Sequence, residues 1–278
     1  MNQVFQNIVV VGAGKMGGAL VDGWLRDGVP ASAISLVDPV LAENDYGWAE
    51  KGVACYANAD ALTGAQADLL MLAVKPQMMD AVLPGLAAFD HAGLSVLSIA
   101  AGTPLARLES AFPQAVCIRT MPNTPAAVGA GITAAYSPSA SDAVREGVSG
   151  LLGAVGAVVW VDNEPAMDAV TAISGSGPAY VFHMVEALAA AGEQLGLPQE
   201  TAMALARQTI VGAGALLNTS EESAQQLRVN VTSPGGTTAA GLNVLQQSGA
   251  LAALMQATAK AAFDRSVDLA ASKPAENP

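Results

Sequence analysis

The sequence is poor in aromatic and basic side chains. Aromatic residues make up 4% of its 278 residues, and 12 Lys and Arg stand against 24 Asp and Glu, a formal net charge of −12. Broad nucleic-acid binding requires a basic face, and an anionic membrane surface repels an acidic chain. The apolar stretch 69–74 is far too short to cross a bilayer. We therefore expect neither nucleic acid nor a membrane as a partner.

Histidine and cysteine are also scarce, with two of each. His91 and His183 lie far apart and neither belongs to an H-E-x-x-H pattern, so we expect no metal site. Cys55 and Cys117 fall in different predicted segments and form no C-x-x-C pair, which predicts reduced, buried thiols. The first six residues lack a basic region followed by an apolar one. We therefore expect no signal peptide and a cytoplasmic protein.

Small apolar residues are what the sequence has in abundance: hydrophobic residues make up 52% of it, and it contains 28 glycines. In the first part, short β-branched runs alternate with helical segments such as 15–27. Parallel neighbours need a helical crossover between them, so this alternation predicts a doubly wound parallel α/β sheet. The predicted strands are 6–11, 33–37, 68–74, 95–99, 116–119, 132–136 and 158–161.

The character of the sequence changes after Asp162. No alternating strand pattern follows, and long Ala- and Leu-rich stretches such as 179–196 and 199–217 are broken by Gly196, Pro198 and Asn218. We predict a nucleotide-binding domain over 1–162 and an all-helical domain over 163–278. The predicted helices are apolar on more than one face, which a lone bundle of this size does not bury. Self-association through the helical domain is therefore expected.

A G-x-G-x-x-G pattern lies where the first predicted strand ends and a helix begins. Its first glycine allows a tight turn, the second lets the backbone approach a pyrophosphate, and the third lets the helix pack on the strand. This position favours a dinucleotide-binding Rossmann domain over a glycine-rich turn without a ligand. The candidate residues are Gly12, Ala13, Gly14, Lys15, Met16 and Gly17.

Three further polar residues follow predicted strands. Asp38, 21 residues after Gly17, is placed to accept hydrogen bonds from ribose hydroxyls and to repel a 2′-phosphate, which favours NADH over NADPH. The alternative is a solvated turn residue before Pro39. Lys75 is a candidate for a contact with a phosphate or ribose of the cofactor, and the alternative is a solvated lysine in a loop. Asn123 is a candidate for the nicotinamide amide, and turn-building is an equal alternative.

The helical region contains a glycine turn at 233–238, followed by a predicted helix start. Free N–H groups at such a start make a seat for a carboxylate, and a capped helix start without a ligand is the alternative. Pro178 in turn suits the first turn of a long helix.

Taken together, these motifs resemble those of the pyrroline-5-carboxylate reductase family. GAGKMG (12–17), AVKPQ (73–77), AAGT (100–103), RTMPNTP (119–125), SGSGPAY (174–180) and the segment 226–246 occur in family order and span about residues 8–265. The resemblance implies reduction of 1-pyrroline-5-carboxylate to L-proline by NADPH or NADH, the last step of proline synthesis. It also implies a helical dimerisation domain, dimers that assemble into larger rings, and active sites between the nucleotide domain and the paired helical domains.

The resemblance also implies roles for particular residues. Cofactor contacts beyond the glycine loop map to Asn58, Ala73, Val74, Lys75, Pro76, Ile99, Ala100 and Ala101. Substrate contacts map to Glu164, Asn230, Thr237 and Thr238, together with Ser233 and Gly236 of the glycine turn. Thr238 is the candidate catalytic residue, which orients the imine nitrogen or relays a proton. Many relatives have a small polar residue near the position of Asp38, so Asp38 departs from a pattern suited to NADPH.

Two other functions compete with this one. A related reductase, such as a β-hydroxyacid dehydrogenase or another imine reductase, is expected to have a catalytic lysine in its helical domain, and no lysine lies between Glu164 and Lys260. A non-catalytic nucleotide sensor on the same fold would bind the dinucleotide without turnover. The candidate substrate segment 230–238 argues against a sensor.

Overall fold

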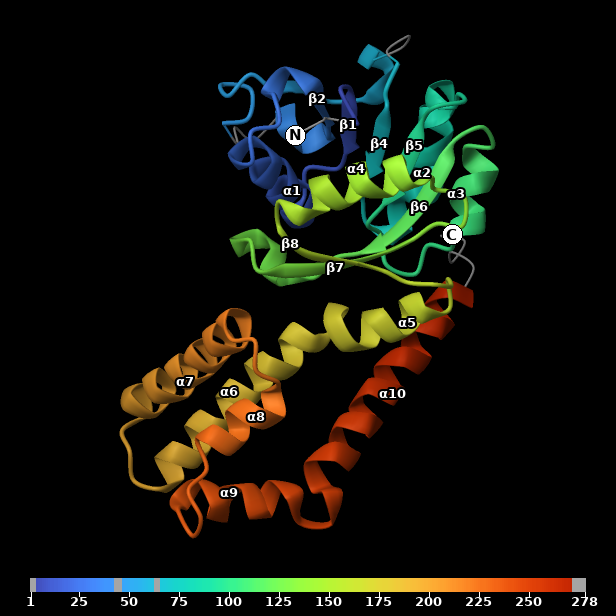
Figure 1. Ribbon diagram of the computed structural model, residues 1–278. Coiled ribbons are helices and arrows are strands. Elements are labelled where there is room, and N and C mark those ends of the chain that lie inside the picture. The colour runs from blue at the N-terminus through green and yellow to red at the C-terminus, as the bar shows by residue number, and fades with distance from the viewer. Residues whose placement is uncertain (1–3, 43–46, 63–65, 272–278) are drawn as a thin grey trace, which may run out of the picture. The chain divides into compact units, whose positions relative to one another are not determined.

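The computed structural model describes residues 4–42, 47–62 and 66–271, and the predicted polar tail at 272–278 lies outside them (Figure 1). The chain forms two compact units. One runs to Ser176 and resumes at Ala262, and the other is Gly177–Ala261. Residues 163–176, assigned from the sequence to the second domain, group with the first unit by their contacts.

The first unit is built on an eight-stranded sheet with the order β3-β2-β1-β4-β5-β6-β7-β8. All seven predicted strands are present, and the sequence-based prediction of a doubly wound α/β fold is confirmed. The strands are β1 (Ile8–Val11), β2 (Ile34–Val37), β3 (Ala54–Tyr56), β4 (Leu69–Leu72), β5 (Ser95–Ser98), β6 (Val116–Met121), β7 (Gly131–Tyr136) and β8 (Gly156–Trp160).

Helices cover both faces of this sheet (Figure 1). The central strands β1 and β4 read IVVV and LLML and are buried at every position, as expected for strands with cores on both sides. Trp24 and Leu152 contribute to the core on one face, and Phe112 and Met79 to the core on the other. The helices of this unit are α1 (Lys15–Arg26), α2 (Met79–Val82), α3 (Leu105–Ala111), α4 (Asp142–Gly153) and α5 (Ala166–Val170).

Two features of the sheet correct the sequence-based prediction. Strand β3 was not predicted, because three residues of intermediate burial at a sheet edge carry no readable periodicity. The sheet is also not wholly parallel, since β6 and β7 pair antiparallel. Only nine residues, 122–130, connect these two strands. A parallel crossover needs a dozen or more residues, so the chain returns in the opposite direction.

The remaining helices confirm the all-helical prediction, since no strand occurs among the described residues after β8. A π-helical turn, Thr171–Gly175, follows α5 directly. Large apolar side chains remain exposed on the second unit, among them Phe182, Leu205, Leu216 and Leu254. The helices are α6 (Gly177–Gln194), α7 (Gln199–Thr219), α8 (Ala224–Asn230), α9 (Thr237–Gln246) and α10 (Ala250–Ala271), whose last residues belong to the first unit.

Within the described ranges, none of the helices combines the length and the apolar character that a membrane span requires.

Candidate active site

The loop after β1 requires glycine at its first position. Gly12 has φ +111°, and its N–H donates to the Val37 carbonyl at 2.8 Å. A Cβ on Gly12 would lie 2.7 Å from the carbonyl carbon and oxygen of Ala73, too close for any side chain. Gly12 therefore lets the loop turn sharply while it packs against the ends of β2 and β4.

The other two glycines of the motif have opposite surroundings. A Cβ on Gly17 would lie 2.2 Å from the Gly12 carbonyl oxygen, so glycine is needed for α1 to start against the loop. A Cβ on Gly14 would meet no atom within 4 Å, and Gly14 is exposed. Gly14 is the N-cap of α1, with no side-chain cap and no acidic residue in the first turn. This open helix start fits the pyrophosphate of a dinucleotide.

Asp38 has a structural role that the sequence did not reveal. Its carboxylate accepts hydrogen bonds from the Ala13 N–H at 2.6 Å and from the Val40 N–H at 2.9 Å. It therefore ties the glycine loop to the turn after β2 and is not merely a solvated turn residue. A carboxylate has about four acceptor positions, so two remain for ribose hydroxyls.

The other cofactor candidates follow neighbouring parallel strands. The Ala73 N–H donates to Val11 at 2.8 Å, and the Ile99 N–H donates to Leu72 at 3.1 Å. Because β1, β4 and β5 are parallel neighbours, the loops after them gather at one edge of the sheet. Lys15, Asn58, Lys75 and Ala101 are exposed, Ala13 and Ala100 are buried, and Met16, Val74, Pro76 and Ile99 are half-buried.

Asn123 has both ends of its amide engaged within the protein. Its Nδ2 donates to the Ser174 carbonyl at 3.2 Å, and its Oδ1 accepts the Ile132 N–H at 2.9 Å. Asn123 therefore joins the loop before β7 to the π-helical turn. These contacts support the turn-building alternative.

Glu164 lies in a partly buried network that includes Arg119, a residue that the sequence analysis missed. Its Oε1 accepts the Leu105 N–H at 2.7 Å and Arg119 Nη1 at 3.0 Å. Arg119, on β6, has a side chain only 6% exposed, and its Nη2 lies 4.0 Å from Asp168 Oδ1. One signal in the sequence could have identified Arg119: it is the single charged residue in a buried strand, and a buried charge needs a partner.

The glycine turn of the second unit confirms the predicted helix start. Gly235 has φ +71°, Gly236 is the N-cap of α9, and the Gly236 N–H donates to the Ser233 carbonyl at 3.0 Å. Thr237 opens the helix, and the Thr238 side chain that follows is exposed. The α9 start has no side-chain cap and no acid in its first turn, so its N–H groups suit an anion.

Asn230, the last residue of α8, is held by its neighbours. Its Nδ2 donates to Glu222 Oε2 at 2.9 Å, and its Oδ1 accepts from Gln226 Nε2 at 2.8 Å. These two bonds fix the orientation of the amide.

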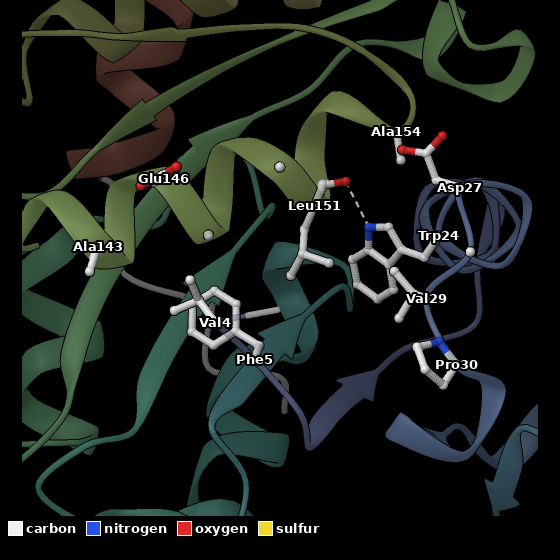
Figure 2. A pocket seen from close by; sticks show the side chains of 13 residues that line it. Val4, Phe5, Trp24, Asp27, Val29, Pro30, Ala143, Glu146, Leu151 and Ala154 are labelled. Atoms are coloured by element: carbon white, nitrogen blue, oxygen red, sulfur yellow. Dashed lines mark hydrogen bonds between the residues drawn. The ribbon is translucent and has the colours of Figure 1, made fainter. Parts of the chain in front are cut away.

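A cavity of about 610 Å³ lies elsewhere in the first unit, beside α1 and α4 (Figure 2). Trp24 lines it and donates from Nε1 to the Leu151 carbonyl at 2.8 Å. None of the sequence-predicted site residues lines this cavity. Among residues 4–42, 47–62 and 66–271, no cluster of three or more His, Cys, Asp or Glu side chains is arranged to hold a metal ion.

A mostly parallel sheet with an open glycine loop at the start of α1 defines a dinucleotide-binding protein of the Rossmann type. Comparison with known families agrees. Residues 7–102 match the model described as NADP oxidoreductase, coenzyme F420-dependent, and residues 164–269 match pyrroline-5-carboxylate reductase dimerisation.

Individual relatives point to one family. The chain is 41% identical to a pyrroline-5-carboxylate reductase of Pseudomonas aeruginosa, over 95% of this chain and 96% of that protein. It is 36% identical to one from Glycine max, over 91% and 92%. A solved pyrroline-5-carboxylate reductase structure from Coxiella burnetii superposes with a TM-score of 0.88 at 35% identity, over 95% and 98%. One from Plasmodium falciparum with NADP bound gives 0.78 at 28%, over 95% and 98%.

The chain belongs to the pyrroline-5-carboxylate reductase family. It is an NAD(P)H-dependent oxidoreductase, and its helical region is the dimerisation domain of the family. The family, fold and cofactor class predicted from the sequence are thereby confirmed.

Proposed function

We propose that this chain transfers a hydride from NAD(P)H to the C=N bond of 1-pyrroline-5-carboxylate and releases L-proline, the last step of proline biosynthesis. The observation that carries the proposal is the pair of open helix starts. One, at Gly14, suits a pyrophosphate, and the other, at Gly236, suits a carboxylate. The identity of 41% over 95% of the chain to a reductase of that name supports the same substrate.

The first unit supplies the residues proposed to hold the cofactor. When bound, the nicotinamide supplies the hydride. The N–H groups at the start of α1 hold the pyrophosphate, where the partial positive charge of the helix end favours an anion. Asp38 accepts hydrogen bonds from the adenosine ribose, and its negative charge disfavours a 2′-phosphate, so we propose that NADH is the preferred cofactor.

The second unit supplies the carboxylate seat. The N–H groups of Thr237 and Thr238 have no intrahelical acceptor in the first turn of α9, so they are proposed to hold the substrate carboxylate, beside the turn that the Gly236 N–H closes by donating to Ser233. Ser233 lies in the same turn. Glu164 and Asn230 are proposed as further substrate contacts.

Thr238 is the proposed catalytic residue. A cyclic imine accepts hydride well once its nitrogen is protonated, so the enzyme must orient the ring and keep or supply that proton. A threonine hydroxyl is too weak an acid to protonate the imine by itself. Thr238 is therefore assigned to hydrogen-bond the ring nitrogen, as an orienting group or a proton relay for an imine that binds already protonated.

Self-association and location complete the proposal. The exposed apolar side chains of the second unit are proposed to form the dimer interface, and the dimers to assemble further into a ring. The cytoplasm is proposed as the site of the reaction.

A growth experiment tests the proposed function. The chain is expressed in a bacterial strain that requires proline because its own pyrroline-5-carboxylate reductase has been deleted. The wild-type chain should restore growth without proline, and Thr238→Ala at equal expression should restore it poorly. Failure of the wild-type chain, expressed as a folded protein, would contradict the proposal.

A further inference from the structure

The first unit contains a partly buried ionic network centred on Arg119. The side chain of Arg119 is 6% exposed, and the two carboxylates that face it, Glu164 and Asp168, are 28% and 15% exposed. A buried guanidinium is costly unless it is paired, and its planar fork can address two acceptors at once. Here Nη1 faces Glu164 at 3.0 Å and Nη2 faces Asp168 at 4.0 Å.

The same two carboxylates reach other parts of the unit. Glu164 Oε1 also accepts the N–H of Leu105, the first residue of α3, at 2.7 Å. Asp168 Oδ1 accepts from the buried hydroxyl of Ser266 on α10 at 2.7 Å. Arg119 therefore connects the start of α3, which follows the cofactor candidates Ile99, Ala100 and Ala101, to the end of α10.

This arrangement fixes Glu164 from two sides through one oxygen. The Leu105 N–H and the Arg119 guanidinium both bind Oε1, so the direction in which the rest of the carboxylate points is set by two contacts. Two carboxylates and one guanidinium also leave one formal negative charge, which favours a protonated imine nearby.

We propose that Arg119 is a positioning residue for the reduction: it holds Glu164 in the orientation that contacts the imine substrate. This inference rests on the proposed function, because it takes Glu164 as a substrate contact. Arg119 itself touches neither substrate nor cofactor in this assignment. Its effect therefore falls on the substrate and not on the dinucleotide.

The test is Arg119→Lys, which keeps the charge but cannot form the two-pronged contact. Arg107→Lys is the matched control, since Arg107 pairs with Asp80 at a more exposed position on α3. Arg119→Lys should raise KM for pyrroline-5-carboxylate about tenfold, the scale of one lost charge-assisted hydrogen bond. The cofactor KM should stay within about twofold, and Arg107→Lys should match the wild type.

A double variant separates positioning from general stability. If Arg119 acts through Glu164, Arg119→Lys combined with Glu164→Gln should have the same substrate KM as Glu164→Gln alone. Additive effects, or a loss of kcat with both KM values unchanged, would overturn the inference. If Arg119→Lys does not fold, Asp168→Asn loosens the guanidinium from its other side and should raise the substrate KM about threefold. An unchanged substrate KM in that variant would overturn it equally. Absence of turnover by the wild type would instead overturn the proposed function, and this inference with it.

Discussion

Gly14→Ala should leave the fold intact while it damages cofactor binding. Gly14 has φ −64° and ψ −177°, which alanine adopts freely, and its added Cβ would meet no protein atom within 4 Å. The substitution should therefore change the free energy of unfolding by no more than about 1 kcal/mol, because the lower entropy of the unfolded chain is offset by the poorer N-cap that alanine makes. The same methyl group would stand where the pyrophosphate is proposed to approach the backbone.

The size of the binding loss follows from the contacts at stake. Displacing the pyrophosphate from one backbone N–H removes a hydrogen bond to a charged group, worth about 1.5–3 kcal/mol. That corresponds to a dissociation constant for NADH or NADPH roughly 10- to 100-fold higher. Binding is followed by nicotinamide fluorescence and stability by thermal unfolding. Gly150→Ala on α4 is the control, because its Cβ also meets no atom within 4 Å. Wild-type affinity in Gly14→Ala would refute the assignment of this loop to the pyrophosphate.

Four further predictions address other parts of the molecule. Thr238→Ala should lower kcat by roughly one to two powers of ten. Thr238→Ser should retain most of the wild-type kcat because the hydroxyl remains. Unchanged turnover in the alanine variant would remove Thr238 from the mechanism. Burial, together with the charges of Glu109 and Asp90, raises the pKa of the Cys117 thiol from 9.0 to about 12. A thiol reagent at pH 8 should therefore react with native Cys117 roughly three powers of ten more slowly than with the unfolded chain, and fast native labelling would contradict this. The pKa of Cys117 is higher in the folded chain than in the unfolded chain. The difference in free energy of unfolding between the wild type and Cys117→Ala, measured by denaturant unfolding, should therefore be constant below pH 9.0 and should decrease as the pH rises towards about 12. Leu205 on α7 is 54% exposed in the single chain, and we place it in the subunit interface. Leu205→Asp should therefore lower the mass of the assembly measured by light scattering. An unchanged mass would place the interface elsewhere.

Much of the fold could be predicted from the sequence because its signals are local. The β-branched run at β1 and the apolar run at β4 mark strands buried on both faces, and Gly196 and Pro198 mark the break between α6 and α7. The glycine roles at Gly12 and Gly17 also follow from their place between strand and helix. The edge strand β3 could not be predicted so directly, because its three residues carry no readable periodicity. The antiparallel direction of β7 was not predicted either, because pairing direction depends on connection length and not on periodicity.

The site was less predictable wherever a residue acts through a distant partner. Asp38 was expected at the end of β2, but its hydrogen bond to Ala13 depends on a turn 25 residues earlier in the chain. The partners of Arg119 come from separate elements, and nothing in the run VCIRTM names Glu164 or Asp168 as those partners. Asn123 likewise carried two interpretations, and its contacts with Ser174 and Ile132, which favour turn-building, could not be read from the motif.

The most direct test of the proposed function follows the near-ultraviolet absorbance of the reduced nicotinamide when purified protein meets pyrroline-5-carboxylate, with NADH and NADPH in parallel. We predict loss of absorbance matched by formation of proline, and a higher kcat/KM with NADH because of the Asp38 carboxylate. Turnover with a higher kcat/KM for NADPH would contradict the role given to Asp38. Dinucleotide binding without turnover by either cofactor would contradict the proposed reaction itself.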